Sequence, residues 1–163
     1  MDDLILHIEG VEGECNLDGY AKMITCLSYS HGVSNALQTD VANVGRSIGR
    51  CSHGDFTVSK YLDKASPLLA YKSCIGANLG TVTFTGLRSH GDAGHAPFII
   101  YTFDNTMISN VSVSAGSGST PVESVSLNYT KIKWEYKVQG ENMAEPGSVA
   151  SEWDLTVNVG SSG

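Results

Sequence analysis

Histidine and aspartate recur together in glycine-containing segments, and these residue types could ligate a metal ion. The segments are Ser30-His31-Gly32, Ser52-His53-Gly54-Asp55 and Ser89-His90-Gly91-Asp92, with His95 close behind. Imidazole and carboxylate groups bind transition metals, so one hypothesis is a metal-dependent barrel enzyme that uses His53, Asp55, His90, Asp92 and His95. However, no His-x-His pair is followed by a carboxylate on a strand. Aspartate and glycine are also ordinary turn residues that need no ligand.

Other patterns that could support catalysis or ligand binding are weaker. A Ser/His/Asp triad can be drawn from the same residues, but no predicted helix N-terminus lies near it to hold an oxyanion. Gly116–Thr120 (GSGST) lacks a lysine and precedes a strand, so it is not a phosphate-binding loop. Trp134 and Trp153 could form a sugar-binding platform, yet at inward strand positions tryptophan usually belongs to the core. We therefore expect no catalytic residue, cofactor or metal, and instead a structural or binding role.

The four cysteines are Cys15, Cys26, Cys51 and Cys74. They are too widely spaced for a zinc knuckle and too few for a disulfide scaffold. Cys15 and Cys51 fall in predicted loops and are expected to be the more reactive pair, whereas Cys26 and Cys74 fall in a strand and a helix. We expect reduced structural thiols, and whether any of them form disulfides stays open.

One stretch, Phe56–Gly76 (FTVSKYLDKASPLLAYKSCIG), predicts its own local structure. An extended apolar run begins at Phe56 and ends near residue 63. Ser66 is then suited to cap a helix, Pro67 to its first turn, and Gly76 to a left-handed end. The sequence therefore predicts a strand that leads into a helix of about ten residues.

Short strands account for most of the remaining chain, which has 18 glycines and many Ser, Thr and Val residues. Alternation of apolar and polar residues predicts strands at Leu4–Ile8, Ala21–His31, Gly80–Arg88, Phe98–Phe103, Met107–Ala115, Val122–Val138 and Trp153–Val159. Val111 and Val113 are expected to point inward. Gly86 shifts the phase of its strand and predicts a β-bulge.

Two of these strands indicate the architecture. One face of Ala21–His31 is large and apolar, whereas the other carries Ser28 and Ser30, so we expect this smaller face to line a wet space. Val122–Val138 exchanges its buried face near Thr130-Lys131, as a strand does at the corner of a barrel. The fold class predicted is mainly β: an antiparallel β-barrel of about eight strands with one short α-helix.

The chain is predicted to form one domain, residues 1–163, with 160–163 (GSSG) a disordered tail or cloning remnant. Ser34–Asp55 has no consistent period and is predicted to be a long loop, which usually indicates function or contact with another chain. The net charge of −7 and scattered basic residues disfavour nucleic acid and anionic membranes as partners. Neither a membrane span nor a signal peptide is visible, so we expect cytoplasmic synthesis and, on export, a route without a cleaved leader.

Three stretches carry a resemblance to a known family: Phe56–Leu69 (FTVSKYLDKASPLL), Val125–Tyr136 (VSLNYTKIKWEY) and Met107–Gly118 (MISNVSVSAGSG). With them, nearly the whole chain resembles the hemolysin-coregulated protein (Hcp) family, the inner-tube subunits of bacterial type VI secretion systems. Lys64-Ala65-Ser66-Pro67 at the helix start is the most specific piece. The chain departs from the family in its cysteines, in the histidine-rich hairpin Ser89–His95 and in the variable loop Gly32–Asp55.

The resemblance implies a homohexameric ring, and rings that stack into a tube with sheath, spike and effector proteins as partners. It also implies a bacterial cytoplasmic protein that is later secreted. Matching the family position by position puts Ser30, with Ser28 beside it, in the lumen as a contact for effectors, or as a residue that only keeps the wall hydrated. The long loop would reach a neighbouring subunit or ring through Gly45, Arg46, Ser47, Ile48, Gly49 and Arg50.

Overall fold

A computed structural model describes residues 3–37, 48–89, 94–138 and 147–162 of the chain. Thirteen strands and one helix follow one another in these residues. They are β1 (Asp3–Ile8), β2 (Ile24–Cys26), β3 (Ser28–Ser30), β4 (Val33–Leu37), β5 (Ile48–His53), β6 (Phe56–Tyr61), α1 (Ser66–Ile75), β7 (Val82–Ser89), β8 (His95–Asp104), β9 (Met107–Ser114), β10 (Val122–Asn128), β11 (Lys131–Lys137), β12 (Ser148–Asp154) and β13 (Val159–Ser162). Over the same residues, no helix has the length and apolarity needed to cross a membrane.

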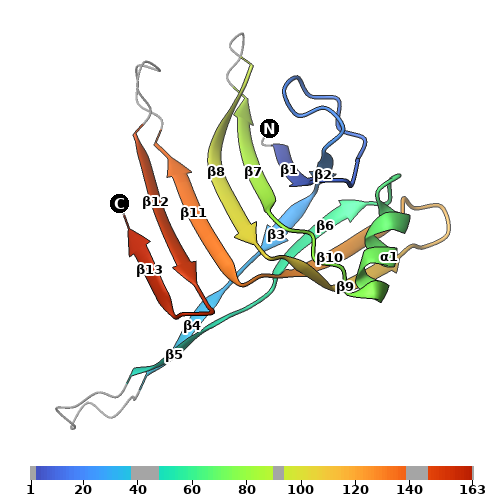
Figure 1. Cartoon of the computed structure of the whole chain (residues 1–163). Coiled ribbons are helices and arrows are strands. Elements are labelled where there is room, and N and C mark those ends of the chain that lie inside the picture. Colours follow the sequence, from blue (N-terminus) through green and yellow to red (C-terminus); the bar gives the residue numbers. More distant parts are fainter. Residues whose placement is uncertain (1–2, 38–47, 90–93, 139–146, 163) are drawn as a thin grey trace.

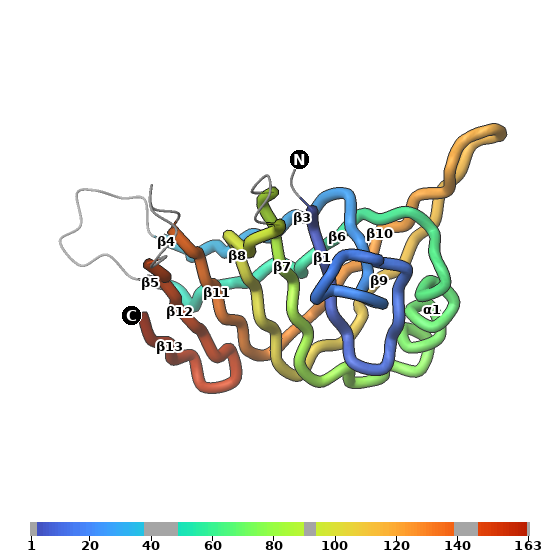
Figure 2. The backbone as a smooth tube through the Cα atoms, turned by 90° about the horizontal axis from the view of Figure 1, so that it is seen from above, coloured from blue at the N-terminus to red at the C-terminus, as the bar shows by residue number. Residues whose placement is uncertain are grey.

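The strands form two antiparallel sheets and a separate ribbon (Figure 1). The seven-stranded sheet has the order β13-β12-β11-β8-β7-β1-β2, and the four-stranded sheet has the order β3-β6-β10-β9. β4 and β5 pair only with each other. Helix α1 lies beside β9 at one end of the molecule, and the hairpin β12–β13 lies at the other end (Figures 1 and 2).

Two chain segments pass from one sheet to the other and join the sheets into a barrel-like wall. β10 of the smaller sheet continues through Tyr129 and Thr130 into β11 of the larger one, which confirms the predicted exchange of buried face. β2 similarly continues into β3 at Leu27, whose N–H donates to the Ser59 carbonyl (2.6 Å). The single strand predicted over Ala21–His31 is therefore wrong, because two successive outward residues at this corner reverse the alternation.

The main core fills the space between the two sheets. Its centre is aromatic: the Phe56 ring lies 4.7 Å from the Phe103 ring and 5.0 Å from the Phe84 ring, measured between centroids. Such pairs add about 0.5–1.5 kcal/mol each beyond the burial of their area. Other fully buried members are Leu6, Ile24, Val58, Leu69, Val82, Val125, Leu127 and Ile132. Val111 is partly buried as predicted, but Val113 is exposed, because it lines an open groove beside Pro67 and Ala70 of α1.

The predicted β-bulge at Gly86 is confirmed. The pairing of β7 with β8 shifts register between Gly86 and Leu87, and Leu87 is fully buried. A Cβ atom on Gly86 would lie 2.8 Å from Ile99 Cγ2 and 3.0 Å from the Phe98 ring. The close approach of these two side chains therefore requires glycine at this position.

Helix α1 has the predicted bounds, but its first turn is built differently. Pro67 lies in that turn, and Gly76 ends the helix in the left-handed conformation with φ 62°. The N-cap is Ala65, and Ser66 is the first helical residue, so the predicted capping role of Ser66 is wrong. The Ser66 hydroxyl instead donates to the Glu123 carboxylate (2.6 Å), which is buried beneath the helix.

The described part of Ser34–Asp55 is an antiparallel ribbon and not the predicted loop. It runs from Val33 opposite His53 to Leu37 opposite Ile48, and it projects from the body of the molecule (Figure 1). Every residue of β4 is exposed. A strand without a buried face has no apolar alternation, which is why the sequence pattern did not reveal it.

The C-terminal segment also differs from its prediction. Instead of one strand over Trp153–Val159, β12 ends at Asp154 and the chain turns back as β13. The Asp154 carboxylate accepts hydrogen bonds from the Thr156 N–H (2.9 Å) and hydroxyl (2.5 Å), and Asn158 adopts φ 56° to complete the turn. Residues 160–162 belong to β13, so the predicted disordered tail is a paired edge strand.

Candidate functional site

The outer face of the four-stranded sheet carries eight small, uncharged polar side chains in two rows that cross all four strands. One row contains Ser28, Ser59, Ser124 and Ser112, and the other contains Ser30, Thr57, Ser126 and Asn110. Within the second row the Thr57 and Ser126 hydroxyls are hydrogen-bonded (3.0 Å). We call these eight residues the hydroxyl face.

Strand alternation places the hydroxyl face outside. On β6, Phe56 and Val58 are buried in the core, whereas Thr57 and Ser59, which alternate with them, are partly exposed. On β10 a valine and a leucine are buried in the same way, and the two serines alternate with them. Ser28 and Ser30, the predicted site residues, are both exposed on β3.

The charged side chains of the same two strands point into the molecule. Lys60 is fully buried, and its Nζ lies 2.7 Å from Glu123 Oε2 and 2.9 Å from Asp63 Oδ1. The same ammonium group donates to the Ser66 hydroxyl (3.1 Å) and the Tyr61 carbonyl (3.2 Å). The ammonium group is thus surrounded by acceptors, which a buried charge requires.

This arrangement is the reverse of an ordinary solvent-facing sheet, which carries lysine and glutamate on its outer side. Hydroxyls both donate and accept hydrogen bonds and hold a layer of water without attracting either sign of charge. Among the described residues, none of the eight side chains hydrogen-bonds to a histidine or carboxylate that could activate it. The face is therefore a neutral surface suited to contact with water.

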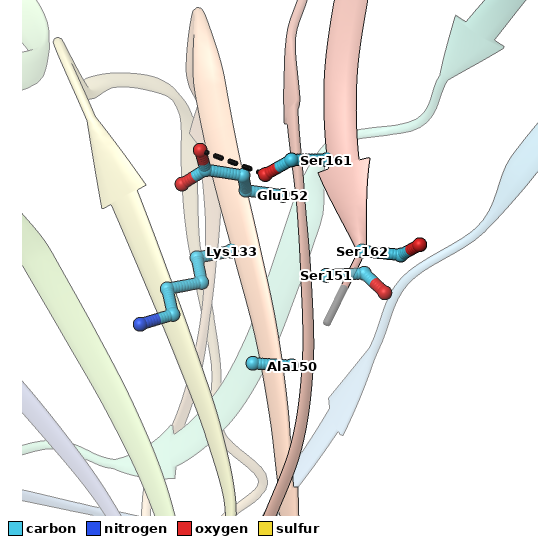
Figure 3. Close-up of a pocket in the computed structure, with 6 residues that line it drawn as sticks. All are labelled: Lys133, Ala150, Ser151, Glu152, Ser161 and Ser162. Atoms are coloured by element: carbon cyan, nitrogen blue, oxygen red, sulfur yellow. Dashed lines mark hydrogen bonds between the residues drawn. The ribbon is translucent and has the colours of Figure 1, made fainter.

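The outer side of the larger sheet provides the contrast. A shallow hollow of about 290 Å³ lies over β11, β12 and β13 and is lined by Lys133, Ala150, Ser151, Glu152, Ser161 and Ser162 (Figure 3). The Glu152 carboxylate accepts a hydrogen bond from Ser161 (3.1 Å) and lies 3.8 Å from the Lys131 ammonium. This wall is charged and mixed in sign, as expected for a surface in bulk solvent.

The residues of the metal hypothesis do not converge. The Asp55 carboxylate accepts hydrogen bonds from a serine of β9 and an asparagine of β10 (2.6 and 3.0 Å). His95 Nδ1 lies 3.4 Å from the Asp3 carboxylate at another place in the fold. His90 and Asp92 lie outside the described residues. Within the part of the chain that the structure describes, no group of three or more His, Cys, Asp or Glu could hold a metal ion.

His53 has a different environment from the one expected of a metal ligand. Its Nδ1 is hydrogen-bonded to the Tyr129 hydroxyl (2.9 Å), and the same hydroxyl also meets His31 Nε2 (2.5 Å). Burial lowers the pKa of both histidines, and the charge of His53 lowers that of His31 further. This cluster lies at the base of the ribbon. Among the described residues, no hydrogen bond links it to His95, which lies beside Asp3.

A family model described as "Type VI secretion system effector, Hcp" matches residues 5–136. The chain belongs to the Hcp family. A solved structure of a type six secretion system protein shares 26% identity with it at a TM-score of 0.91, covering 99% of this chain and 100% of that one. Hcp1 from Salmonella typhimurium shares 25% identity at a TM-score of 0.77, covering 98% and 99%. No curated protein matches.

The ribbon includes part of the segment predicted from the sequence to contact other copies. Of the six predicted contact residues, Gly45, Arg46 and Ser47 lie outside the described residues. Ile48, Gly49 and Arg50 lie on β5, where Arg50 Nη2 donates to the Leu155 carbonyl (3.3 Å).

Residues 45–49 also have the G-x-S-x-G spacing of a nucleophile elbow. That motif requires a helix after the serine, and here strand β5 begins at residue 48.

The positions of the tryptophans and cysteines test two further predictions from the sequence. Trp134 and Trp153 pack against the core, which disfavours a sugar platform. All four cysteines are free. Cys15 is buried with Ile5 and Leu87, so its predicted reactivity is wrong, and the exposed cysteine is Cys74.

Six members of the hydroxyl face were missed by sequence reasoning, which singled out only Ser28 and Ser30. The signal was present in FTVSKY and VESVSLN, where hydroxyl residues alternate with buried apolar ones. The alternation within each strand does not reveal the pairing register between strands, and it is this register that aligns the polar residues of the four strands into two rows.

Proposed function

We propose that this Hcp protein is a non-enzymatic tube subunit whose six copies close into a ring with the hydroxyl face lining the bore. Rings stack into a tube, a contractile sheath drives the tube, and effectors travel inside it. The observation that carries the proposal is the neutral hydroxyl face on a chain whose net charge is −7.

An uncharged bore follows from the task of the tube. Fixed charges on its wall would bind cargo of the opposite sign and exclude cargo of the same sign, and in a ring each charge would be repeated six times. Serine and threonine hydroxyls instead keep the wall hydrated and exchange hydrogen bonds with water. Burial of Lys60 and Glu123 beneath the face keeps the two charges of β6 and β10 from reaching the bore.

Exposed apolar side chains at the α1 end support contact between copies. A groove of about 260 Å³ lies between the helix and the β9–β10 pair, and most of its lining is apolar: Leu62, Pro67, Ala70, Val111 and Val113. Tyr71, Ile75 and Met107 are also exposed at this end. Contiguous apolar surface of this kind usually marks an interface.

The opposite end of the molecule also exposes apolar side chains. Val149, Val157 and Val159 are exposed on the β12–β13 hairpin, and Val33 and Leu37 are exposed on the ribbon. The elements that carry these two sets of exposed apolar residues lie at opposite ends of the molecule (Figure 2). This arrangement fits a head-to-tail contact, which closes into a ring when the rotation between copies permits. Each interface of a stable ring should bury more than ~1,000 Å².

The ribbon is assigned the contact with the next subunit or ring, through Ile48, Gly49 and Arg50 on β5 and through the segment 45–47 before it. The remaining partners of the chain are the sheath, spike and effector proteins of its secretion system. The protein is proposed to be secreted from the bacterial cytoplasm.

A gold-cluster label tests which face lines the bore. Ser124→Cys would be labelled in a Cys51→Ser/Cys74→Ser background, which removes the two more accessible native thiols. Negative-stain images of the rings should place the label inside the central hole. Lys133→Cys on the charged wall is the matched control and should place it on the rim. The opposite pattern would reject the assignment.

The metal-enzyme hypothesis is disfavoured by the separate partners of Asp55, His53 and His95. Elemental analysis of protein purified without chelator tests it. A near-stoichiometric metal content would support it against the tube subunit.

A further inference from the structure

Two histidines and a tyrosine meet where the ribbon joins the body. Tyr129 is buried at the corner between β10 and β11, and its hydroxyl contacts His31 Nε2 and His53 Nδ1. The two imidazole centroids are 6.1 Å apart. The Trp134 ring packs beside both, at 6.4 Å from His31 and 5.9 Å from His53.

The positions of the histidines in the chain make this cluster a fastening for the ribbon. His31 lies two residues before β4, and His53 is the last residue of β5. Gly32 and Gly54 follow them, and the Gly54 N–H donates to the Gly32 carbonyl (2.9 Å). Both strands are thus held to one hydroxyl, and glycine next to each attachment lets the backbone turn with little steric resistance.

Hydrogen-bond chemistry allows only certain protonation states of this cluster. A tyrosine hydroxyl has one proton to donate and accepts at its oxygen. One imidazole must therefore accept that proton, while the other donates its N–H to the oxygen. A first added proton can go to the far nitrogen of the donating histidine and leaves both bonds intact. A second would protonate the accepting nitrogen, leave the phenol proton without an acceptor in the cluster and put two cations side by side.

Among the described residues, no carboxylate forms an ion pair with His31 or His53 that would offset that second charge. Asp55 is the nearby carboxylate, and both of its oxygens already accept hydrogen bonds from Ser109 and Asn128. The Cys51 thiol contacts Asn158, and Arg50 on the same strand brings a positive charge that is bound to the Leu155 carbonyl. Tyr101 packs 6.1 Å from His31, between ring centroids, and adds no charge.

We propose that the His31–Tyr129–His53 cluster is a pH-sensitive latch that holds the base of the β4–β5 ribbon when both histidines are neutral and releases it when both are protonated. Burial lowers the pKa of each histidine in the closed state, so the open state takes up more protons. Closure is therefore fully favoured above the ordinary histidine pKa of about 6.5 and is lost as the pH falls below it. For a ring-forming subunit, release would weaken the ribbon's contacts with other copies. That consequence rests on the proposed function, whereas the latch does not.

Hydrogen exchange of the ribbon tests the proposal. Amides of β4 and β5 would be followed at about pH 7.5 and about pH 5.5, with rates corrected for intrinsic exchange. In the wild type the corrected rates should rise at the lower pH. The rise should be at most about tenfold per pH unit for each proton that the cluster takes up on opening. His31→Gln/His53→Gln, which does not titrate, should show no such rise. His95→Gln, which changes a histidine outside the cluster, should retain it.

An unchanged ribbon in the wild type, or an equal rise in the double variant, would overturn the latch. Should the double variant not fold, NMR titration of the wild-type histidines decides. A midpoint below about 6.5 for whichever of His31 and His53 titrates at the lower pH supports the latch, and a midpoint of that histidine at or above this value rejects it. Light scattering at both pH values distinguishes failure of the ring from failure of the latch. If the protein is monomeric at both pH values, the ring is rejected, and hydrogen exchange of the ribbon still tests the latch.

Discussion

Removing the carboxylate of Glu123 should destabilise the protein more than almost any other single isosteric change. Glu123→Gln preserves the shape of the side chain but takes away the acceptor charge 2.7 Å from the Lys60 ammonium, in a place where neither side chain is accessible to water. Breaking a buried ion pair by removing one partner costs roughly 3–5 kcal/mol. Because Asp63 stays 2.9 Å from the ammonium and still compensates part of its charge, we expect the low end, about 3 kcal/mol.

Urea denaturation measures this loss. With an m-value of about 2 kcal/mol/M, the midpoint should fall by about 1.5 M. All variants must be compared at one protein concentration, since assembly would add to the apparent stability. Glu152→Gln is the matched control, because its partner Lys131 is 3.8 Å away and both side chains are about 40% exposed. That substitution should change the free energy of unfolding by less than ~1 kcal/mol.

A double substitution separates loss of charge pairing from loss of packing. Lys60→Met/Glu123→Leu removes both buried charges and should recover most of the stability lost in Glu123→Gln, because apolar residues can replace a buried ion pair with little net cost. The reasoning is refuted if Glu123→Gln destabilises no more than Glu152→Gln. It is also refuted if the double variant is less stable than the single one.

Three further outcomes are expected. Gly86→Val should lower the stability by about 1–3 kcal/mol in thermal unfolding, since its Cβ would overlap Ile99 and Phe98, and an unchanged melting temperature would contradict this. Maleimide labelling at mildly alkaline pH should modify Cys74 and spare Cys26, because burial raises the pKa of Cys26 to about 12. Rapid modification of Cys26 in the native protein would contradict its burial in the core. Ser30→Gln should leave rings intact and reduce retention of a co-purifying effector, and equal retention would mean that Ser30 only hydrates the wall.

The sequence predicted those elements that carry a local signal. β6 could be recognised because its apolar residues follow a period of 2. Pro67 and Gly76 marked the two ends of α1, and Gly86 marked the bulge. The exchange of faces near Thr130 was also visible, since the alternation itself reverses there. Ribbon strand β4 was invisible for the opposite reason: all five of its residues are exposed, and without burial there is no periodic signal.

The sequence could not reveal what depends on contacts between distant strands. Ser66 had the features of a helix cap, but its hydroxyl is held by Glu123, 57 positions along the chain. Lys60 would be assigned to the surface by composition alone. The hydroxyl face is a similar case: Ser28 and Ser30 were identified one strand at a time, while the neutral surface results from the register of four strands.

The central claim is that the hydroxyl face lines the bore of a six-membered ring, and an electron cryo-microscopy reconstruction of the purified protein tests it most directly. The account predicts six-fold rings with β3, β6, β10 and β9 facing the central channel and the charged wall of β11 and β12 facing outward. A solitary subunit at high concentration, or a ring with Ser59 and Ser124 on its outer surface, would contradict it.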